Sequence, residues 1–284
     1  MKVFNNRASL KISVVALVVS LTLGLSGLIQ AATTPDLGEA ASFAILSSTY
    51  TNTVAGTTIN GDLGYTTGPA FAPTVNGTVY SPPSTKYSQA GIDQGAALAA
   101  LNSQACTHTF PAGAVDLATD TSHGPIGVYT PGVYCATAAT AVSIGTAGIT
   151  LSGSGTYIFR IAGGLTSVAD SSVTLADGAS ACDVFWTPAE PTTLGANSTF
   201  AGINIDDMGI TIGSAVTWTG SALAFGGTVS TDTDAISVGT CTTGLPDGGV
   251  GPEEKSISWN IIMLAGIFGL ALISLGASLR KHTS

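Results

Sequence analysis

A tripeptide with a central threonine recurs along the second half of the chain. An apolar or small residue precedes the threonine, and Leu or Ile follows it. Copies lie about 18 to 24 residues apart, too close for separate domains but suited to one turn of a coiled sheet. Successive side chains in a strand face opposite ways, so inward Leu and Ile leave the threonines outward. We therefore expect one column of outward residues, at Thr150, Thr174, Thr193 and Thr211, with a degenerate copy at Ser230.

The last two copies open a longer repeat. Aligning Thr193 with Thr211 superposes residues 192–209 on 210–227, and it places Thr199 on Thr217 and Phe200 on Trp218. A step of about 18 residues accommodates three short strands and their corners, and it predicts an all-β chain built as a triangular β-solenoid.

One segment has helical character. Residues 86–104 are rich in alanine and leucine, and Ser84 or Thr85 can cap the start of a helix. We expect a helix over about 85–104 that packs along one side of the solenoid.

Both ends of the chain carry apolar runs. Basic residues precede the run at 12–28, which predicts a signal peptide over 1–32, with an uncleaved membrane anchor as the alternative. The uncharged run at 259–279 is long enough to span a bilayer, and the basic tail 280–284 follows it. The positive-inside rule then leaves a body of residues 33–244 outside the cell.

A linker over 245–258 separates the body from this predicted span. Its first residues, Leu245-Pro246-Asp247-Gly248-Gly249, resemble a sortase-type sorting signal, but Gly248 occupies the position of the usual Thr. We therefore expect retention in the cell membrane by the span rather than covalent transfer to the cell wall.

Positive charge is scarce in the body, which contains only Lys86 and Arg160. A nucleic-acid partner is excluded, because its binding needs clustered basic residues. We expect Arg160 to be structural and paired with a carboxylate or with backbone carbonyls.

Four cysteines, Cys106, Cys135, Cys182 and Cys241, lie in this exported body, which predicts disulfides. Of the three possible pairings we favour Cys106 with Cys135 and Cys182 with Cys241, because each pair then brackets one section of the chain. We expect neither a metal nor a cofactor, since no close Cys-x-x-Cys occurs and His108 and His123 have no regular spacing to the thiols.

Several motifs in a fixed order resemble the bacterial and fungal ice-binding proteins of the DUF3494 type. The resemblance covers about residues 37–241. The motifs are Leu37-Gly38-Glu39-Ala40-Ala41-Ser42-Phe43, Asn60-Gly61-Asp62-Leu63-Gly64, Pro131-Gly132-Val133-Tyr134, Tyr157-Ile158-Phe159-Arg160, Asp183-Val184-Phe185-Trp186 and Thr193-Leu194-Gly195 through Phe200-Ala201-Gly202. The resemblance implies an irregular, discontinuous right-handed β-solenoid of triangular cross-section with one long helix alongside.

The resemblance also implies a flat ice-binding side that carries the outward residue of each tripeptide. The implied residues are Thr150, Thr174, Thr193, Thr211 and Ser230, flanked by Ser172 and Thr228, with Thr58 and Thr66 as candidates in the N-terminal coils. Together with the predicted span, this indicates a monomeric cell-surface protein whose partner is the surface of ice crystals.

Two alternatives stay open. A surface adhesion or structural module could share the solenoid without binding ice. A β-helix enzyme acting on polysaccharides needs grouped carboxylates. The candidates for that role, Asp206-Asp207 and Asp232-Asp234, fall near predicted corners. We interpret them as solvated turn acids and expect no enzyme.

Overall fold

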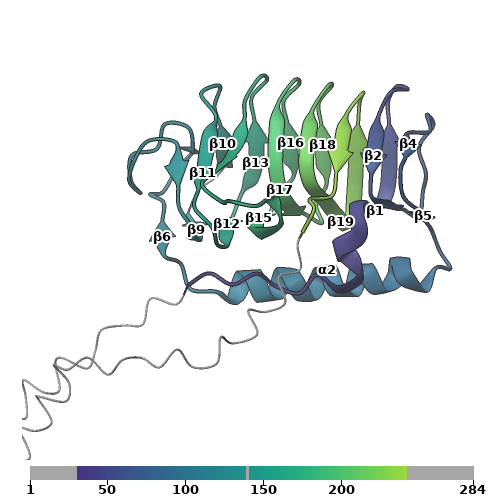
Figure 1. Cartoon of the computed structure of the whole chain (residues 1–284), viewed down its shortest axis with the longest axis horizontal. Helices are drawn as coiled ribbons and strands as arrows, with labels where there is room; N and C mark the ends of the chain where they lie inside the picture. Colours follow the sequence, from purple (N-terminus) through teal and green to yellow (C-terminus); the bar gives the residue numbers. More distant parts are fainter. Residues whose placement is uncertain (1–30, 139–140, 242–284) are drawn as a thin grey trace, which may run out of the picture. The chain divides into compact units, whose positions relative to one another are not determined.

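Parallel strands stack into coils in the computed structural model, which describes residues 31–138 and 141–241 (Figure 1). Strand pairing gives the coils three sides, and the long strand β19 (Thr217–Thr231) contributes to all three in turn. We number them side 1, which faces the helix, side 2 and side 3.

Side 1 and side 2 together hold most of the strands. Side 1 contains β6 (His108–Thr109), β9 (Gly132–Ala136), β12 (Tyr157–Ile161), β15 (Val184–Pro188), the second part of β17 (Thr199–Ile205), the middle of β19, the first part of β1 (Phe43–Asn52), β3 (Asp62–Gly64) and β5 (Val79–Tyr80). Side 2 contains β7 (Val115–Asp116), β10 (Ala141–Ile144), β13 (Gly164–Ser167), β16 (Thr192–Leu194), β18 (Ile210–Ile212) and the last parts of β19 and β1.

Side 3 contains β8 (Val128–Tyr129), β11 (Ile149–Ser152), β14 (Val173–Ala176), the first parts of β17 and β19, β20 (Ala235–Ser237), β2 (Thr58–Asn60) and β4 (Thr74–Val75). Between β14 and β17 the pairing is reduced to a single bridge, from Ser172 to Thr199. Side 3 therefore consists of a three-stranded part and a five-stranded part joined at that bridge.

The order of coils along the solenoid differs from their order in the chain. β1 pairs with both β19 and β3, so the N-terminal coils stack on the last coil of the C-terminal part. Helix α2 (Thr85–Ser103) then runs along the stack to the far end, where the chain starts again at β6 (Figure 1). This arrangement confirms a discontinuous solenoid with one helix beside it.

Aromatic rings fill the axis of the stack. Phe159 lies 4.2 Å from Trp186, Trp186 lies 5.3 Å from Phe200, and Phe200 lies 4.9 Å from Trp218, measured between ring centroids. The indole nitrogens donate to backbone carbonyls of Ala201 and Gly202. Each large apolar side chain buried in this way contributes roughly 1.5–3 kcal/mol, so the stack stabilises the coils against unfolding.

Helix α2 forms where the sequence predicts it. The Ser84 side chain accepts a hydrogen bond from the Tyr87 backbone nitrogen and caps the helix start. Its buried residues, which recur every three or four positions and face side 1, are Tyr87, Ala90, Gln94, Ala97 and Leu101. The Gln94 side chain donates to Asp207 at 2.7 Å and accepts from the Phe225 nitrogen at 3.2 Å, which pins the helix to a corner of the solenoid.

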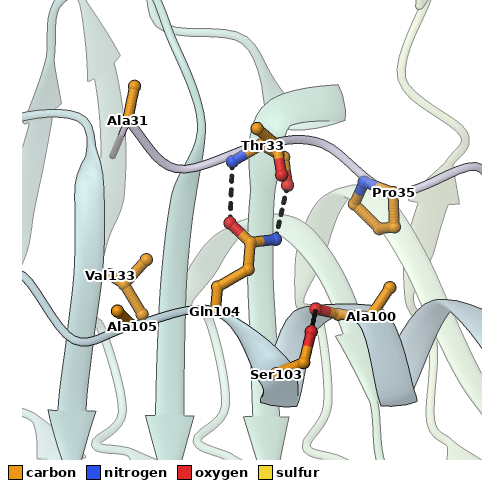
Figure 2. A pocket seen from close by; sticks show the side chains of 8 residues that line it. All are labelled: Ala31, Thr33, Pro35, Ala100, Ser103, Gln104, Ala105 and Val133. Carbon is orange, nitrogen blue, oxygen red and sulfur yellow. Dashed lines mark hydrogen bonds between the residues drawn. The ribbon is translucent and has the colours of Figure 1, made fainter. Parts of the chain in front are cut away.

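Two short helical segments precede strands of side 1. A 3-10 helix, η1 (Gly38–Ser42), precedes β1, and a second, η2 (Ala181–Asp183), precedes β15. The chain before η1 lies along the end of α2, where the Gln104 side chain forms two hydrogen bonds with the Thr33 backbone, at 2.8 and 2.7 Å (Figure 2). The predicted disulfides are confirmed, Cys106 with Cys135 and Cys182 with Cys241.

Several predicted segments lie outside the described residues. These are nearly all of the signal peptide over 1–32, the linker over 245–258, the membrane span over 259–279 and the tail over 280–284. Within the described part of the chain, no helix combines the length and the apolar character needed to cross a bilayer.

Candidate functional site

Side 2 carries one unbroken column of hydroxyl groups. Strand register aligns six outward residues in consecutive coils, namely Ser143, Thr166, Thr193, Thr211, Ser230 and Thr51. Strands β16 and β18 each turn a single side chain outward, because their central threonine is exposed while both neighbours are buried. At β16 and β18 side 2 is therefore one outward residue wide, whereas Thr228 of β19, paired with Thr49 of β1, adds a second position beside Ser230.

Side 3 carries two parallel columns across five consecutive strands. The first column consists of Thr199, Thr217, Ala235, Thr58 and Thr74. The second lies two residues further along each strand and consists of Thr219, Ser237, Asn60 and Asn76, while the equivalent position in β17 holds the buried Ala201. Coils repeat about every 4.8 Å, and alternate residues within a parallel strand lie about 6.6 Å apart. Side 3 is therefore a two-dimensional grid.

Amide groups fix one end of this grid. The Asn76 side-chain nitrogen donates to the Asn60 side-chain oxygen at 2.7 Å, and the Asn60 nitrogen donates to Ser237 Oγ at 2.9 Å. A chain of hydrogen bonds therefore runs across three adjacent coils and holds these polar groups in register. The strands of side 3 contain no charged residue, as far as the described bounds extend.

The predicted single column of threonines is wrong. Thr150 and Thr174 pair with each other on side 3, whereas Thr193, Thr211 and Ser230 pair on side 2. The coils differ in length, so the step from Thr150 to Thr174 is longer than the step from Thr193 to Thr211, although each step spans one coil. The step from Thr174 to Thr193 falls short of a full coil and ends on a different side.

The other predicted residues also separate. Ser172 flanks Thr174 on side 3, next to the bridge with Thr199, and Thr228 flanks Ser230 on side 2. Thr58 belongs to the first column of side 3. Thr66 lies by the helix instead, because its hydroxyl is 3.2 Å from the Tyr87 hydroxyl of α2.

Two corner carboxylates are buried, which corrects their interpretation as solvated turn acids. Asp206 accepts hydrogen bonds from Thr192 Oγ1 at 2.7 Å and from the Met208 nitrogen at 2.9 Å. Asp234 accepts from the backbone nitrogens of Val216 and Asp232. Burial raises the pKa of each carboxyl to about 6, and the hydrogen bonds only partly offset it. Both groups hold corners of the coils together.

A histidine cluster closes the end of the solenoid near β6. Ser122 Oγ lies 3.1 Å from His108 Nε2, a contact that sequence spacing did not indicate. The Asp120 carboxylate, however, accepts from Ser122 and bonds to His123, which stacks on Tyr129 at 3.9 Å. In a hydrolytic triad the carboxylate orients the histidine that contacts the serine. Here Asp120 bonds to the other histidine, so the cluster has the arrangement of an end cap.

Most residues of the side 3 grid lie outside the tripeptides that predict the ice-binding side. The signal of the grid is a polar residue on each side of one buried apolar residue, as in Thr217-Trp218-Thr219, Thr58-Ile59-Asn60 and Thr74-Val75-Asn76. This pattern marks a strand that turns two neighbouring polar side chains outward. The tripeptide has a leucine or isoleucine after the threonine, so it does not include this pattern.

Comparisons with known proteins show the family. A family model described as Ice-binding-like matches residues 45–237. The ice-binding protein of Flavobacterium frigoris (strain PS1) is 33% identical over 190 residues, which covers 63% of this chain and 68% of that protein. Ice-binding protein 1 of Shewanella frigidimarina (strain NCIMB 400) is 33% identical over 199 residues, covering 59% of this chain but only 22% of that protein.

Solved structures share the fold. The crystal structure of an ice-binding protein from the Antarctic ascomycete Antarctomyces psychrotrophicus is similar with a TM-score of 0.63 and 27% identity, covering 74% of this chain and 100% of that chain. An ice-binding protein from an Antarctic bacterium of the Flavobacteriaceae gives the same TM-score and identity and covers 74% of this chain and 48% of that chain. The chain belongs to the Ice-binding-like family.

Proposed function

We propose that this protein adsorbs to ice through the two-column grid of side 3. The observation that carries the proposal is the register of Thr199, Thr217 and Thr58 beside that of Thr219 and Asn60 in the same strands. A crystal surface repeats in two directions, so a grid can match it over an area. At β16 and β18 side 2 has a single column of hydroxyls, which matches it only along a line.

Rigidity supports the same choice. Threonine has a branched Cβ that restricts χ1, so its methyl and hydroxyl groups hold fixed positions on a strand. The side chains of Thr199, Thr217 and Thr219 are exposed, which leaves their hydroxyls available to water. Methyl groups caged by water and hydroxyls that anchor the cage would order a surface layer onto which ice can grow.

Charge is the second requirement. Ions orient water around themselves and disturb a lattice-like layer, so an adsorbing side should be neutral. The strands of side 3 meet this condition over their described length, and side 1 is covered by α2. Side 2, by contrast, carries a charged residue, Asp116, in its end strand β7.

Uptake into growing ice tests the proposal. Fluorescently labelled protein comprising residues 32–244, which hold both disulfides, is added to a growing ice hemisphere. We expect the label to enter the ice. Exclusion of the label, with the protein folded, would favour the adhesion or structural module without ice binding.

Attachment of a cell to ice extends the proposal and rests on the predicted span over 259–279. A protein held in the membrane would keep its cell at the crystal surface, whereas a released protein would act on distant crystals. Fractionation of cells that express the full chain distinguishes the two. We expect the protein in the membrane fraction, and recovery from the medium alone would contradict attachment.

A further inference from the structure

A pocket of about 400 Å³ opens beside the last turns of α2 and contains a guanidinium group. Leu98 and Asn102 of α2 line it together with Arg160 of β12 and Thr187 of β15. Arg160 and Thr187 are register partners in adjacent strands of side 1. This pocket is separate from the side 3 grid.

Arg160 lacks a counter-ion. Its Nη1 donates to the Gln104 backbone oxygen at 2.8 Å, which places a positive charge at the C-terminus of α2. Its Nε is buried and has no hydrogen-bond partner. Within residues 31–138 and 141–241, Arg160 forms no salt bridge, whereas Lys86 lies 3.0 Å from Asp62 Oδ2. Capping the helix therefore occupies one of five guanidinium donors and leaves the charge unbalanced.

The rest of the pocket adds hydrogen-bond donors and an apolar wall. Thr187 Oγ1 lies 3.4 Å from Asn102 Oδ1 and 3.5 Å from the Phe159 backbone oxygen, and its one proton is shared between these two acceptors. The NH₂ of the Asn102 amide is the donor that this side chain can offer a ligand. Ile161 and Pro188 line the pocket with carbon atoms. An anion attached to a carbon skeleton fits such a lining. The planar fork of a guanidinium matches a carboxylate better than any other common anion except phosphate.

The second pocket near the end of α2 differs in this respect. It measures about 370 Å³, and Gln104 and Ser103 are its polar side chains from the helix end (Figure 2). The Gln104 amide bonds to the Thr33 backbone with both of its groups, and Ser103 donates to the Ala100 oxygen. These polar side chains are already hydrogen-bonded within the protein, so they are not free to bind a ligand.

We propose that the Arg160 pocket binds a small organic carboxylate. The guanidinium of Arg160 balances the ligand charge, the Asn102 amide donates to a carboxylate oxygen, and the apolar wall contacts the carbon skeleton. The carboxylate can come from an acidic sugar or from a simple organic acid, and both share the chemistry that the pocket recognises.

Titration of the full chain tests the proposal. The ¹H–¹⁵N resonance of Arg160 Nε is followed while sodium D-glucuronate, sodium acetate, sodium phosphate or the neutral methyl glucoside is added. We expect saturable shifts in the millimolar range with both carboxylates, and none with methyl glucoside. Tighter binding of glucuronate than of acetate would identify an acidic sugar as the source, and equal binding a simple acid. Binding of phosphate alone, or of none of the four, would overturn the proposal.

Three variants sharpen the test. Arg160→Lys keeps the charge but loses the fork, so the glucuronate dissociation constant should rise at least about tenfold. Asn102→Asp places a carboxylate inside the pocket, so it should abolish glucuronate binding. Lys86→Gln removes the other cation of the described body and should leave binding unchanged. Parent-like binding by Asn102→Asp would contradict the proposal, even if Arg160 variants fail to fold.

Discussion

Thr199 and Thr217 are register partners in adjacent parallel strands, and both side chains are exposed. Between them the coil passes over side 1 and side 2 and returns to side 3. The next residue in each strand, Phe200 or Trp218, faces the core, and these two rings pack against each other. Backbone pairing of the parallel strands therefore sets the spacing of the outward grid, and the aromatic stack behind it stabilises the coils.

Replacement of Asn60 by Asp should abolish most ice activity at neutral pH. Asn60 bonds to Asn76 and Ser237 in the second column, and a carboxylate there would break one hydrogen bond and place a charge within the grid. The measurement is thermal hysteresis of Asn60→Asp beside Asn197→Asp, a matched change at an exposed corner with φ 57°. Lowering the pH below about 4 should restore part of the Asn60→Asp activity. Equal activity of both variants at pH 7 would show that neutrality of side 3 is unimportant.

The two glycines of α2 should respond to alanine in opposite directions. A Cβ at Gly91 would lie 2.5 Å from the Phe225 ring, whereas a Cβ at Gly95 meets nothing within 4 Å. Gly91→Ala should lower the free energy of unfolding by about 1–3 kcal/mol through overpacking. Gly95→Ala should raise it by about 1 kcal/mol through helix propensity. Urea denaturation measures both, and stabilisation by Gly91→Ala would contradict the close packing of α2 on side 1.

Stability should fall as the pH rises from about 4 to about 7. The pKa values of Asp206 and Asp234 are near 6 in the folded protein, against an ordinary value of 3.8 for a solvated carboxyl, so the folded state binds more protons in this range. Its extra stability is complete below the unfolded pKa and is lost as the pH rises through the folded pKa. For each carboxyl, the free energy of unfolding should fall by on the order of 1–3 kcal/mol over this pH range.

Asp206→Asn isolates this effect. Burial lowers the pKa of His108 and so acts in the opposite direction, but this contribution cancels when the variant is compared with the parent. The free energy of unfolding of Asp206→Asn should depend less steeply on pH between 5 and 7. Asp170→Asn, at an exposed corner, should keep the parent slope. An unchanged slope in Asp206→Asn would mean that its carboxyl is ionised throughout.

Local features of the fold could be predicted from the sequence. The alanine-rich segment and its Ser84 cap located α2, and the repeat alignment gave the register of Thr193 with Thr211 and of Thr199 with Thr217. These features depend on residues that are close in sequence or repeat at a constant step. The two disulfide pairs also follow the sections of the chain that they bracket.

The site could be predicted only in part. A tripeptide such as Val173-Thr174-Leu175 reports that a threonine faces outward, but it does not report which of three sides it lies on. That information depends on the length of every corner, and the coil from Thr166 to Thr193 is longer than the coil from Thr193 to Thr211. Thr58 and Asn60 reach the grid only because β2 pairs with β20, a contact between residues at opposite ends of the body.

Thermal hysteresis of Thr217→Tyr beside Thr211→Tyr tests the central claim most directly. Both threonines are exposed and lie in parallel strands, but Thr217 belongs to the grid of side 3 and Thr211 to the column of side 2. Each bulky ring should block the side that carries it while leaving the melting temperature unchanged. We predict that Thr217→Tyr loses thermal hysteresis and that Thr211→Tyr retains it. Loss in Thr211→Tyr with activity kept in Thr217→Tyr would contradict the account and assign ice binding to side 2.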